Sequence, residues 1–259
     1  MKKTILSTCL MAVFLLAGCG SGTSGNSTTS TPTYPNVTGN WAVTAVSQLI
    51  GTTFQLGGYI TSATPGTVTG TIHVLNSGCY SLSQDVPVTG TLSTSGAISI
   101  TSSTVSSQVI ALSGTINNYV LSGGTYTITG GCAAGDHGTV TGYITLTYSD
   151  VYAGSFYSIP SHLTIGTTIT AGQSGPDSDG FFHVTGSATF SGSPCFASGT
   201  ITASTIAGAY MSVTIGTTNG TVTFYGFQTD STGKTITGDY TVSGGSCNGD
   251  YGTGSVSHS

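Results

Sequence analysis

An alternation of apolar and polar residues with a period of two runs through most of the chain, and it constrains the fold more than any other feature. In residues 66–76, apolar Val68, Ile72 and Val74 alternate with Thr side chains and with His73. Successive side chains of a β-strand point to opposite faces, so this pattern predicts strands with one buried face. No segment after residue 20 has the period of an amphipathic helix. We therefore expect an all-β protein.

The strand-like runs are short and regularly spaced, and Gly, Ser, Asn and Asp, which favour turns, separate them. Parallel neighbours would need long crossover connections, so we expect antiparallel hairpins. In the first half of the chain the predicted strands lie near 38–47, 53–62, 66–76, 86–93, 97–104, 108–116, 119–130 and 138–148. About eight such strands close into a barrel or stack as a sandwich. We favour the barrel and keep the sandwich as the alternative.

The second half of the chain repeats the first. The segment YTITGGCAAGDHG at 126–138 matches YTVSGGSCNGDYG at 240–252. Further upstream, the segment that begins at residue 40 resembles the one that begins at residue 155, and this alignment places Phe156 opposite Trp41. We therefore expect two tandem domains, residues 38–149 and 150–259, each an antiparallel meander of about eight strands.

Four cysteines lie within the repeated body, and the repeat selects their pairing. Cys79 is separated from Cys132 by nearly the same number of residues as Cys195 from Cys247. A secreted chain folds in an oxidising compartment, where such cysteines form disulfides. We predict one disulfide per domain, Cys79–Cys132 and Cys195–Cys247. No CxxC spacing occurs, so we expect no zinc site.

The first residues have the features of a secretory signal. Lys2 and Lys3 precede an apolar run from Ile5 to Leu16. This run is shorter than the roughly 20 residues that a membrane-spanning helix needs. The segment therefore indicates a signal peptide rather than a transmembrane helix, and we assign residues 1–18 to it.

The apolar run ends in Leu16-Ala17-Gly18-Cys19, which resembles the lipobox of bacterial lipoproteins. The resemblance implies cleavage before Cys19 and lipidation of its thiol and amine, which would anchor the chain in a membrane. Gly20 follows, not Asp, and this implies the outer membrane, on its periplasmic side or at the cell surface. Residues 19–37 are rich in Gly, Ser, Thr and Pro, a composition typical of a flexible tether.

Charge is scarce in this sequence, and its scarcity excludes several functions. Only 4% of the residues are charged, and there is no Arg and no Glu. Nucleic-acid binding needs several Lys or Arg residues to neutralise phosphates, and outside the expected signal only Lys234 remains. Phosphoryl transfer is excluded on similar grounds. We also expect almost no ion pairs in the folded protein.

Two acidic segments could carry chemistry. Asp136 and His137 are adjacent, but the second copy has Asp250 followed by Tyr, so we interpret the Asp as a residue that caps its own turn. Asp177 and Asp179 in GPDSDG resemble part of a calcium loop. A surface turn is the favoured interpretation there, with calcium as the alternative. We expect no catalytic residues, no cofactor and no enzymatic activity.

Gly39-Asn40-Trp41 resembles the G-x-W that opens the first strand of lipocalin- and avidin-like barrels. The whole chain resembles two-repeat, Ser/Thr/Gly-rich lipoproteins of Gram-negative bacteria, which implies a location but no activity. Two hypotheses remain. The first is a lipid-anchored surface protein with a structural, adhesive or binding role, whose partners are the membrane and cell-wall material or polysaccharide. The second is a binder of a small apolar ligand or saccharide inside a barrel calyx. The oligomeric state stays open.

Overall fold

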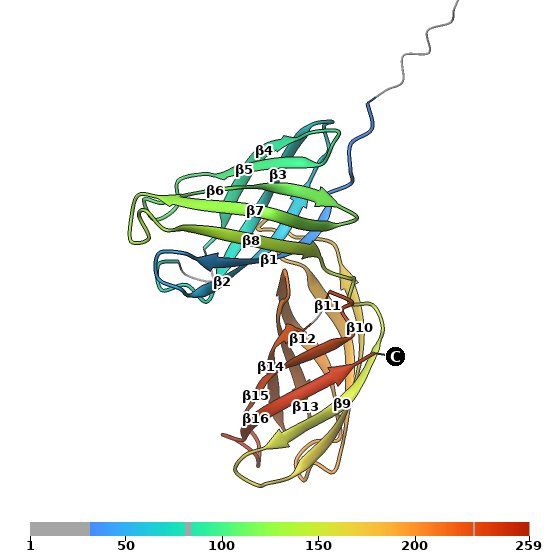
Figure 1. Ribbon diagram of the computed structural model, residues 1–259. Coiled ribbons are helices and arrows are strands. Elements are labelled where there is room, and N and C mark those ends of the chain that lie inside the picture. The colour runs from blue at the N-terminus through green and yellow to red at the C-terminus, as the bar shows by residue number, and fades with distance from the viewer. Residues whose placement is uncertain (1–31, 81–83, 230, 259) are drawn as a thin grey trace, which may run out of the picture. The chain divides into compact units, whose positions relative to one another are not determined.

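The computed structural model describes residues 32–80, 84–229 and 231–258, and one compact unit spans Thr33–Ser259. All regular structure in the described residues is β (Figure 1). The strands are β1 (Gly39–Ser47), β2 (Thr53–Thr61), β3 (Thr67–Leu75), β4 (Val86–Leu92), β5 (Ala97–Ser102), β6 (Val109–Asn117), β7 (Val120–Thr129), β8 (His137–Ile144), β9 (Val151–Ser158), β10 (Thr164–Ser174), β11 (His183–Ser191), β12 (Ser198–Ala207), β13 (Tyr210–Thr217), β14 (Gly220–Gln228), β15 (Thr235–Ser243) and β16 (Tyr251–Ser257).

The strands form two closed antiparallel barrels, which we call barrel 1 (β1–β8) and barrel 2 (β9–β16). Each strand pairs with its neighbours in the chain, and the first and last strands of each barrel pair to close it. The barrels are visible as two separate cylinders of arrows in Figure 1. The predicted all-β fold of two eight-stranded meanders is confirmed, and the barrel is the correct one of the two alternatives.

The period-two alternation has the expected structural role. Every second residue is buried in β5, and also in β7 apart from a register shift between Leu121 and Gly124; these inward side chains fill barrel 1. The outward positions are largely Thr and Ser, which cover the outer face of the strands without adding charge. The two interiors form separate hydrophobic clusters, one for each barrel.

One predicted strand is too long. The pattern predicts a strand over 138–148, but β8 ends at Ile144. Leu146 is 52% exposed, while Tyr148 is buried in the core of barrel 2. Residues 145–150 therefore connect the barrels, and Tyr148 packs in the core of the second barrel rather than the first.

In each barrel, a residue just before the first strand packs into the core. In barrel 1, Val37 is fully buried and its carbonyl accepts a hydrogen bond of 2.8 Å from the Trp41 indole. In barrel 2, Tyr148 is buried beside Tyr152, with 6.2 Å between the ring centroids. The packed body thus includes Val37, which we expected to belong to the tether.

The strand registers correct the predicted match of Trp41 with Phe156. Ala45 faces Phe54 and Val140 on the neighbouring strands, and Phe156 faces Ile165 and Gly254 at the same places in barrel 2. Phe156 therefore corresponds to Ala45. The sequence alignment failed because it matched aromatic residues, whereas the two barrels place their large side chains on different strands.

Candidate functional site

The interior of each barrel is filled, so neither has a ligand calyx. The cavity inside barrel 1 has a volume of about 30 Å³ and an apolar lining, and the cavity inside barrel 2 has about 20 Å³. A small-molecule site usually measures about 300–1,000 Å³. Large side chains take up the space: Phe156 stacks on Phe224 and Tyr240, with centroid separations of 5.3 and 5.0 Å. The alternative hypothesis of a small-ligand calyx is therefore wrong for both barrels.

A disulfide ties together two loops at one end of each barrel, which we call the disulfide end. Cys79–Cys132 joins the loop after β3 to the loop after β7, and Cys195–Cys247 joins the equivalent loops of barrel 2. The two bonds close chain segments of 53 and 52 residues. The predicted pairing is confirmed, with one disulfide in each barrel.

In each barrel, an Asp carboxylate just before the last strand binds two hydroxyl groups, and it is buried in barrel 1 and half-buried in barrel 2. Asp136 accepts hydrogen bonds from Ser47 Oγ at 2.5 Å and from the Tyr126 hydroxyl at 3.0 Å. Burial raises the pKa of Tyr126 to about 12, and the Asp136 carboxylate adds to this effect. The carboxylate thus ties β1 and β7 to the loop before β8.

Barrel 2 repeats the arrangement, with Asp250 bound by Ser158 Oγ at 2.6 Å and by the Tyr240 hydroxyl at 3.2 Å. Burial likewise raises the pKa of Tyr240 to about 12. We expected both Asp residues to cap their own turns, and this is wrong for Asp136, whose bonds go to side chains that are distant in sequence. His137 does not join it, because the His137 ring contacts the Gly135 carbonyl at 3.0 Å and lies exposed.

The far end of barrel 1, opposite the disulfide, carries a groove of about 550 Å³. The turn after β4, the turn after β6 and the segment before β1 form its walls. Of the described residues that line it, none is charged. The lining consists of Thr33, Tyr34, Pro35, Asn36, Thr94, Ser95, Gly96, Thr115, Ile116, Asn117, Asn118 and Tyr119.

Tyr119 is an exposed aromatic side chain of this groove. It is 53% exposed, and its backbone has a φ of 64°. Asn118 before it has a φ of 47°, so the two residues form the left-handed turn that connects tight hairpins. Gly is the usual residue at such a position, and a bulky side chain there is a strained exception. The turn holds the Tyr119 ring outside the barrel.

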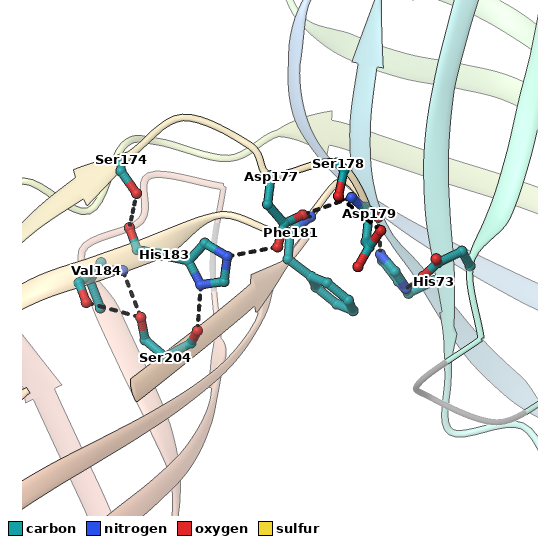
Figure 2. A network of polar contacts seen from close by, with 10 residues as sticks. His73, Ser174, Asp177, Ser178, Asp179, Phe181, His183, Val184 and Ser204 are labelled. Carbon is teal, nitrogen blue, oxygen red and sulfur yellow. Dashed lines mark hydrogen bonds and ion pairs between the residues drawn. The ribbon is translucent and has the colours of Figure 1, made fainter. Parts of the chain in front are cut away.

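A second polar network lies in the loop between β10 and β11, residues 175–182 (Figure 2). The Asp177 carboxylate organises this loop. Its Oδ1 accepts the backbone N–H groups of Asp179 at 3.0 Å and Phe181 at 2.9 Å, and its Oδ2 lies 2.8 Å from Nε2 of His183. The other ring nitrogen of His183 lies 2.6 Å from the carbonyl oxygen of Ser204.

The tip of the same loop contacts β3 of barrel 1. The Phe181 ring stacks on the His73 ring, with 3.6 Å between centroids, and His73 Nε2 lies 3.0 Å from the Asp179 carbonyl oxygen. Figure 2 shows His73 facing this loop. The side chain of His73 is 0% exposed, although the alternation pattern places it on the outward Thr face of its strand. The loop is what buries it.

The pKa values of the two histidines are shifted in opposite directions. Burial lowers the pKa of His73, against the hydrogen bond to Asp179 and the charge of Asp85. The hydrogen bond with Asp177 raises the pKa of His183, against a smaller effect of burial. Burial on its own would raise the pKa of Asp177, but the hydrogen bonds from His183 and from two backbone N–H groups lower it.

The calcium alternative for Asp177 and Asp179 finds no support in this geometry. Both Asp177 oxygens already bind N–H donors, and Asp179 Oδ1 contacts Ser178 Oγ at 3.2 Å. Among the described residues there is also no group of three or more His, Cys, Asp or Glu side chains placed to hold a metal. The loop is a turn organised by Asp177, and its tip packs against barrel 1.

Sequence reasoning missed the Asp–His contacts, because we expected almost no ion pairs. The nitrogens of His73, His183 and His258 lie 3.8, 2.8 and 3.2 Å from oxygens of Asp85, Asp177 and Asp150. His162 contacts the Tyr157 hydroxyl at 3.2 Å. The only usable signal was the occurrence of His and Asp in GPDSDGFFH, six positions apart.

The predicted lipidation site, Cys19, and the signal segment 1–18 lie outside the described residues. Within the described part of the chain, no helix has the length and apolar character to cross a membrane.

Comparison with known proteins shows little. No protein family model matches the chain, and no curated protein matches it. Among solved structures, the chain is similar to a protein of unknown function from the DUF3598 family of Nostoc punctiforme PCC 73102. The two share 9% identity with a TM-score of 0.25, over 86% of this chain and 96% of the other.

Proposed function

We propose that the protein is a lipid-anchored, non-catalytic protein of the bacterial outer membrane that adheres to neutral polysaccharide through the groove of barrel 1. The groove carries this proposal, because the described chain has filled barrel interiors but a groove of about 550 Å³ on the outside of barrel 1. That volume is within the range of ligand sites.

The chemistry of the groove suits a neutral sugar chain. Its hydroxyl and amide groups, from Thr, Ser and Asn side chains, can exchange hydrogen bonds with sugar hydroxyls. Tyr34 and Tyr119 offer an apolar ring face with a polar tip, which suits the apolar face and hydroxyl rim of a pyranose ring. An anionic glycan would find no cation among the described lining residues, so the proposal commits to a neutral one.

The repeat supports this choice of surface. The turn after β12 and the loop after β14 correspond in barrel 2 to the two turns that wall the groove. The first of these binds barrel 1, since Gly208 N–H donates to Asn40 Oδ1 at 2.7 Å and Asn40 Nδ2 donates to the Gly208 carbonyl at 3.0 Å. The equivalent surface of barrel 1 is the groove itself. The far end of this barrel type thus serves as a contact surface in one copy.

The non-catalytic part of the proposal rests on what the polar side chains bind. The carboxylates of Asp136, Asp177 and Asp250 hold hydroxyl or N–H groups of the fold itself. The anchoring part rests on the lipobox-like Leu16-Ala17-Gly18-Cys19 and on the tether that follows it. Together they present the barrels at a membrane surface as an adhesive module.

Binding of the full chain to insoluble neutral glycans, an α-glucan and a β-glucan, tests the proposal, with alginate as the anionic comparison. We expect binding to at least one neutral glycan, and a loss of affinity of about tenfold in Tyr119→Ala from the lost ring contact. Tyr157→Ala is the matched control, because Tyr157 is 42% exposed and lies in β9, away from the groove. Binding to alginate alone, or equal binding by both variants, would contradict the proposal.

Membrane fractionation tests the anchor separately. Replacing Cys19 by Ser should release the protein from membranes and abolish fatty-acid labelling. A Cys19→Ser protein that still fractionates with membranes and takes up label would overturn the lipoprotein assignment without touching the glycan proposal.

A further inference from the structure

The loop of residues 175–182 is the feature of the fold whose contacts depend most on protonation. It is built on the Asp177 carboxylate, which binds the Asp179 and Phe181 N–H groups on one oxygen and His183 on the other. Its tip, Asp179 and Phe181, holds His73 of barrel 1. Phe182 adds an edge contact with Tyr59, with 5.8 Å between ring centroids.

His183 must carry a proton on both ring nitrogens to make its contacts. Nδ1 faces a carbonyl oxygen of Ser204 and Nε2 faces a carboxylate oxygen of Asp177, and both of these atoms are acceptors only. A neutral imidazole could satisfy one of them and would turn a lone pair toward the other. The loop therefore has its full set of bonds only with His183 as the imidazolium.

His73 must instead be neutral. Its Nε2 donates to the Asp179 carbonyl oxygen. Its Nδ1 is buried, has no hydrogen-bond partner among the described residues, and lies 3.8 Å from Asp85 Oδ1. A second proton would place an unbonded cationic N–H in this buried position. The charged groups that face His73 are Asp85 beside it and Asp177 and Asp179 across the contact, and they soften this penalty without removing it.

We propose that residues 175–182 form a pH-sensitive latch between the two barrels, closed when His183 is protonated on both nitrogens and His73 on only one. Because the two histidine pKa values are shifted in opposite directions, the latch is closed in the middle of the pH range. The raised pKa of His183 gives stability that is present below its ordinary value of 6.5 and is lost as the pH rises through the folded value. The lowered pKa of His73 gives stability that is present above 6.5 and is lost as the pH falls through the folded value.

The latch differs from the contact that the turn after β12 makes with barrel 1. Asn40 and Gly208 are joined by two hydrogen bonds between groups that do not titrate. This second contact stays closed when the latch opens, so the opening changes the contact at β3 without separating the barrels. The inference is independent of the proposed glycan binding and goes beyond it.

Amide hydrogen exchange of the full chain between pH 4 and 9, corrected for the intrinsic pH dependence of exchange, tests the latch. Protection of the Asp179 and Phe181 amides, which donate to Asp177 Oδ1, should peak near neutral pH and fall about tenfold toward both ends, as expected for loss of a charge-assisted hydrogen bond. Protection of the Gly208 amide should stay constant, since its partner is the Asn40 side chain.

Two variants separate the loss of protection at acid pH from the loss of protection at alkaline pH. His73→Gln keeps an N–H donor for Asp179 but cannot become charged, so the loss of protection on the acid side should disappear. His183→Gln is uncharged and has both N–H groups on one nitrogen, so it cannot replace the two separate donors of the imidazolium. The loop should therefore be less protected at neutral pH, and the further loss of protection at alkaline pH should disappear. His137→Gln is the matched control, because His137 is exposed and lies at the disulfide end of barrel 1.

Nitrogen-15 shifts of the His183 ring in the unmodified chain provide a readout that does not depend on folding of a variant. At pH 7 both nitrogens should be protonated, while His73 should carry a proton on Nε2 alone. A neutral His183 at pH 7, a charged His73, or a flat protection profile would each overturn the latch.

Discussion

The two barrels are alike at the disulfide end and differ at the far end. At the disulfide end, each has a disulfide that joins the same pair of loops, and each has a Ser–Asp–Tyr cluster with the same bonds. At the far end, barrel 1 has a groove, whereas barrel 2 contacts barrel 1 through the loop of residues 175–182 and the turn after β12. The repeats therefore retain the contacts that stabilise a barrel and differ where a barrel contacts another surface.

The two barrel cores also differ in which strands carry the large side chains, and these differences compensate one another. At three facing positions barrel 1 has Ala45, Phe54 and Val140, and barrel 2 has Phe156, Ile165 and Gly254. A Cβ atom on Gly254 would come within 2.5 Å of the Phe156 ring, which requires Gly there. Total volume is thus distributed differently over the same three strands.

The largest expected effect comes from breaking this compensation. Phe156→Ala should lower the free energy of unfolding by about 3–5 kcal/mol, because it leaves a cavity in the ring stack with Phe224 and Tyr240. Adding Ile165→Phe and Gly254→Val rebuilds the barrel 1 arrangement and should recover part of the loss. Urea unfolding of the full chain measures both. A triple variant no more stable than Phe156→Ala would show that the two cores are not equivalent.

The disulfides give the next largest effect, and it should be the same in both barrels. Replacing both cysteines of either pair by Ala should cost about 2–4 kcal/mol, since the closed segments of 53 and 52 residues are nearly equal in length. Denaturant unfolding of the two double variants provides the comparison. Costs that differ by more than twofold would mean that the disulfide ends are less alike than their contacts indicate.

The Ser–Asp–Tyr clusters give a smaller effect that sharpens the comparison. Asp136→Asn should cost about 1–3 kcal/mol, because an amide replaces a charged acceptor that binds two hydroxyls. Asp250→Asn should cost less, since Asp136 is 7% exposed and Asp250 is only half-buried. Thermal melts of both variants test the ranking, and a larger loss in Asp250→Asn would reverse it.

The sequence alone predicts the strands and the disulfides well, because both depend on local or repeated signals. The period of two fixes which residues point inward, and the repeated Cys spacing fixes the pairing of Cys79 with Cys132. It fails where contacts join residues that are distant in the chain. Nothing near Asp136 in the sequence points to Ser47, and nothing near His73 points to Phe181.

The candidate site was the least predictable part. The groove depends on how two turns and the segment before β1 meet in space, and its residues are ordinary Thr, Ser and Asn. The alternative hypothesis of a calyx was wrong for a related reason, because the volume left inside a barrel depends on which strands carry the large side chains. Tyr119 was not singled out, since a Tyr with a positive φ leaves no mark in the sequence.

Hydrogen-exchange footprinting of the full chain with a neutral oligosaccharide measures directly whether the groove binds a glycan. We expect new protection in residues 94–96 and 117–119, the two turns of the groove, and unchanged exchange in residues 208–209 of barrel 2, which correspond to the first of these turns. Protection confined to barrel 2, or to strands around the barrel 1 interior, would contradict the proposed glycan site.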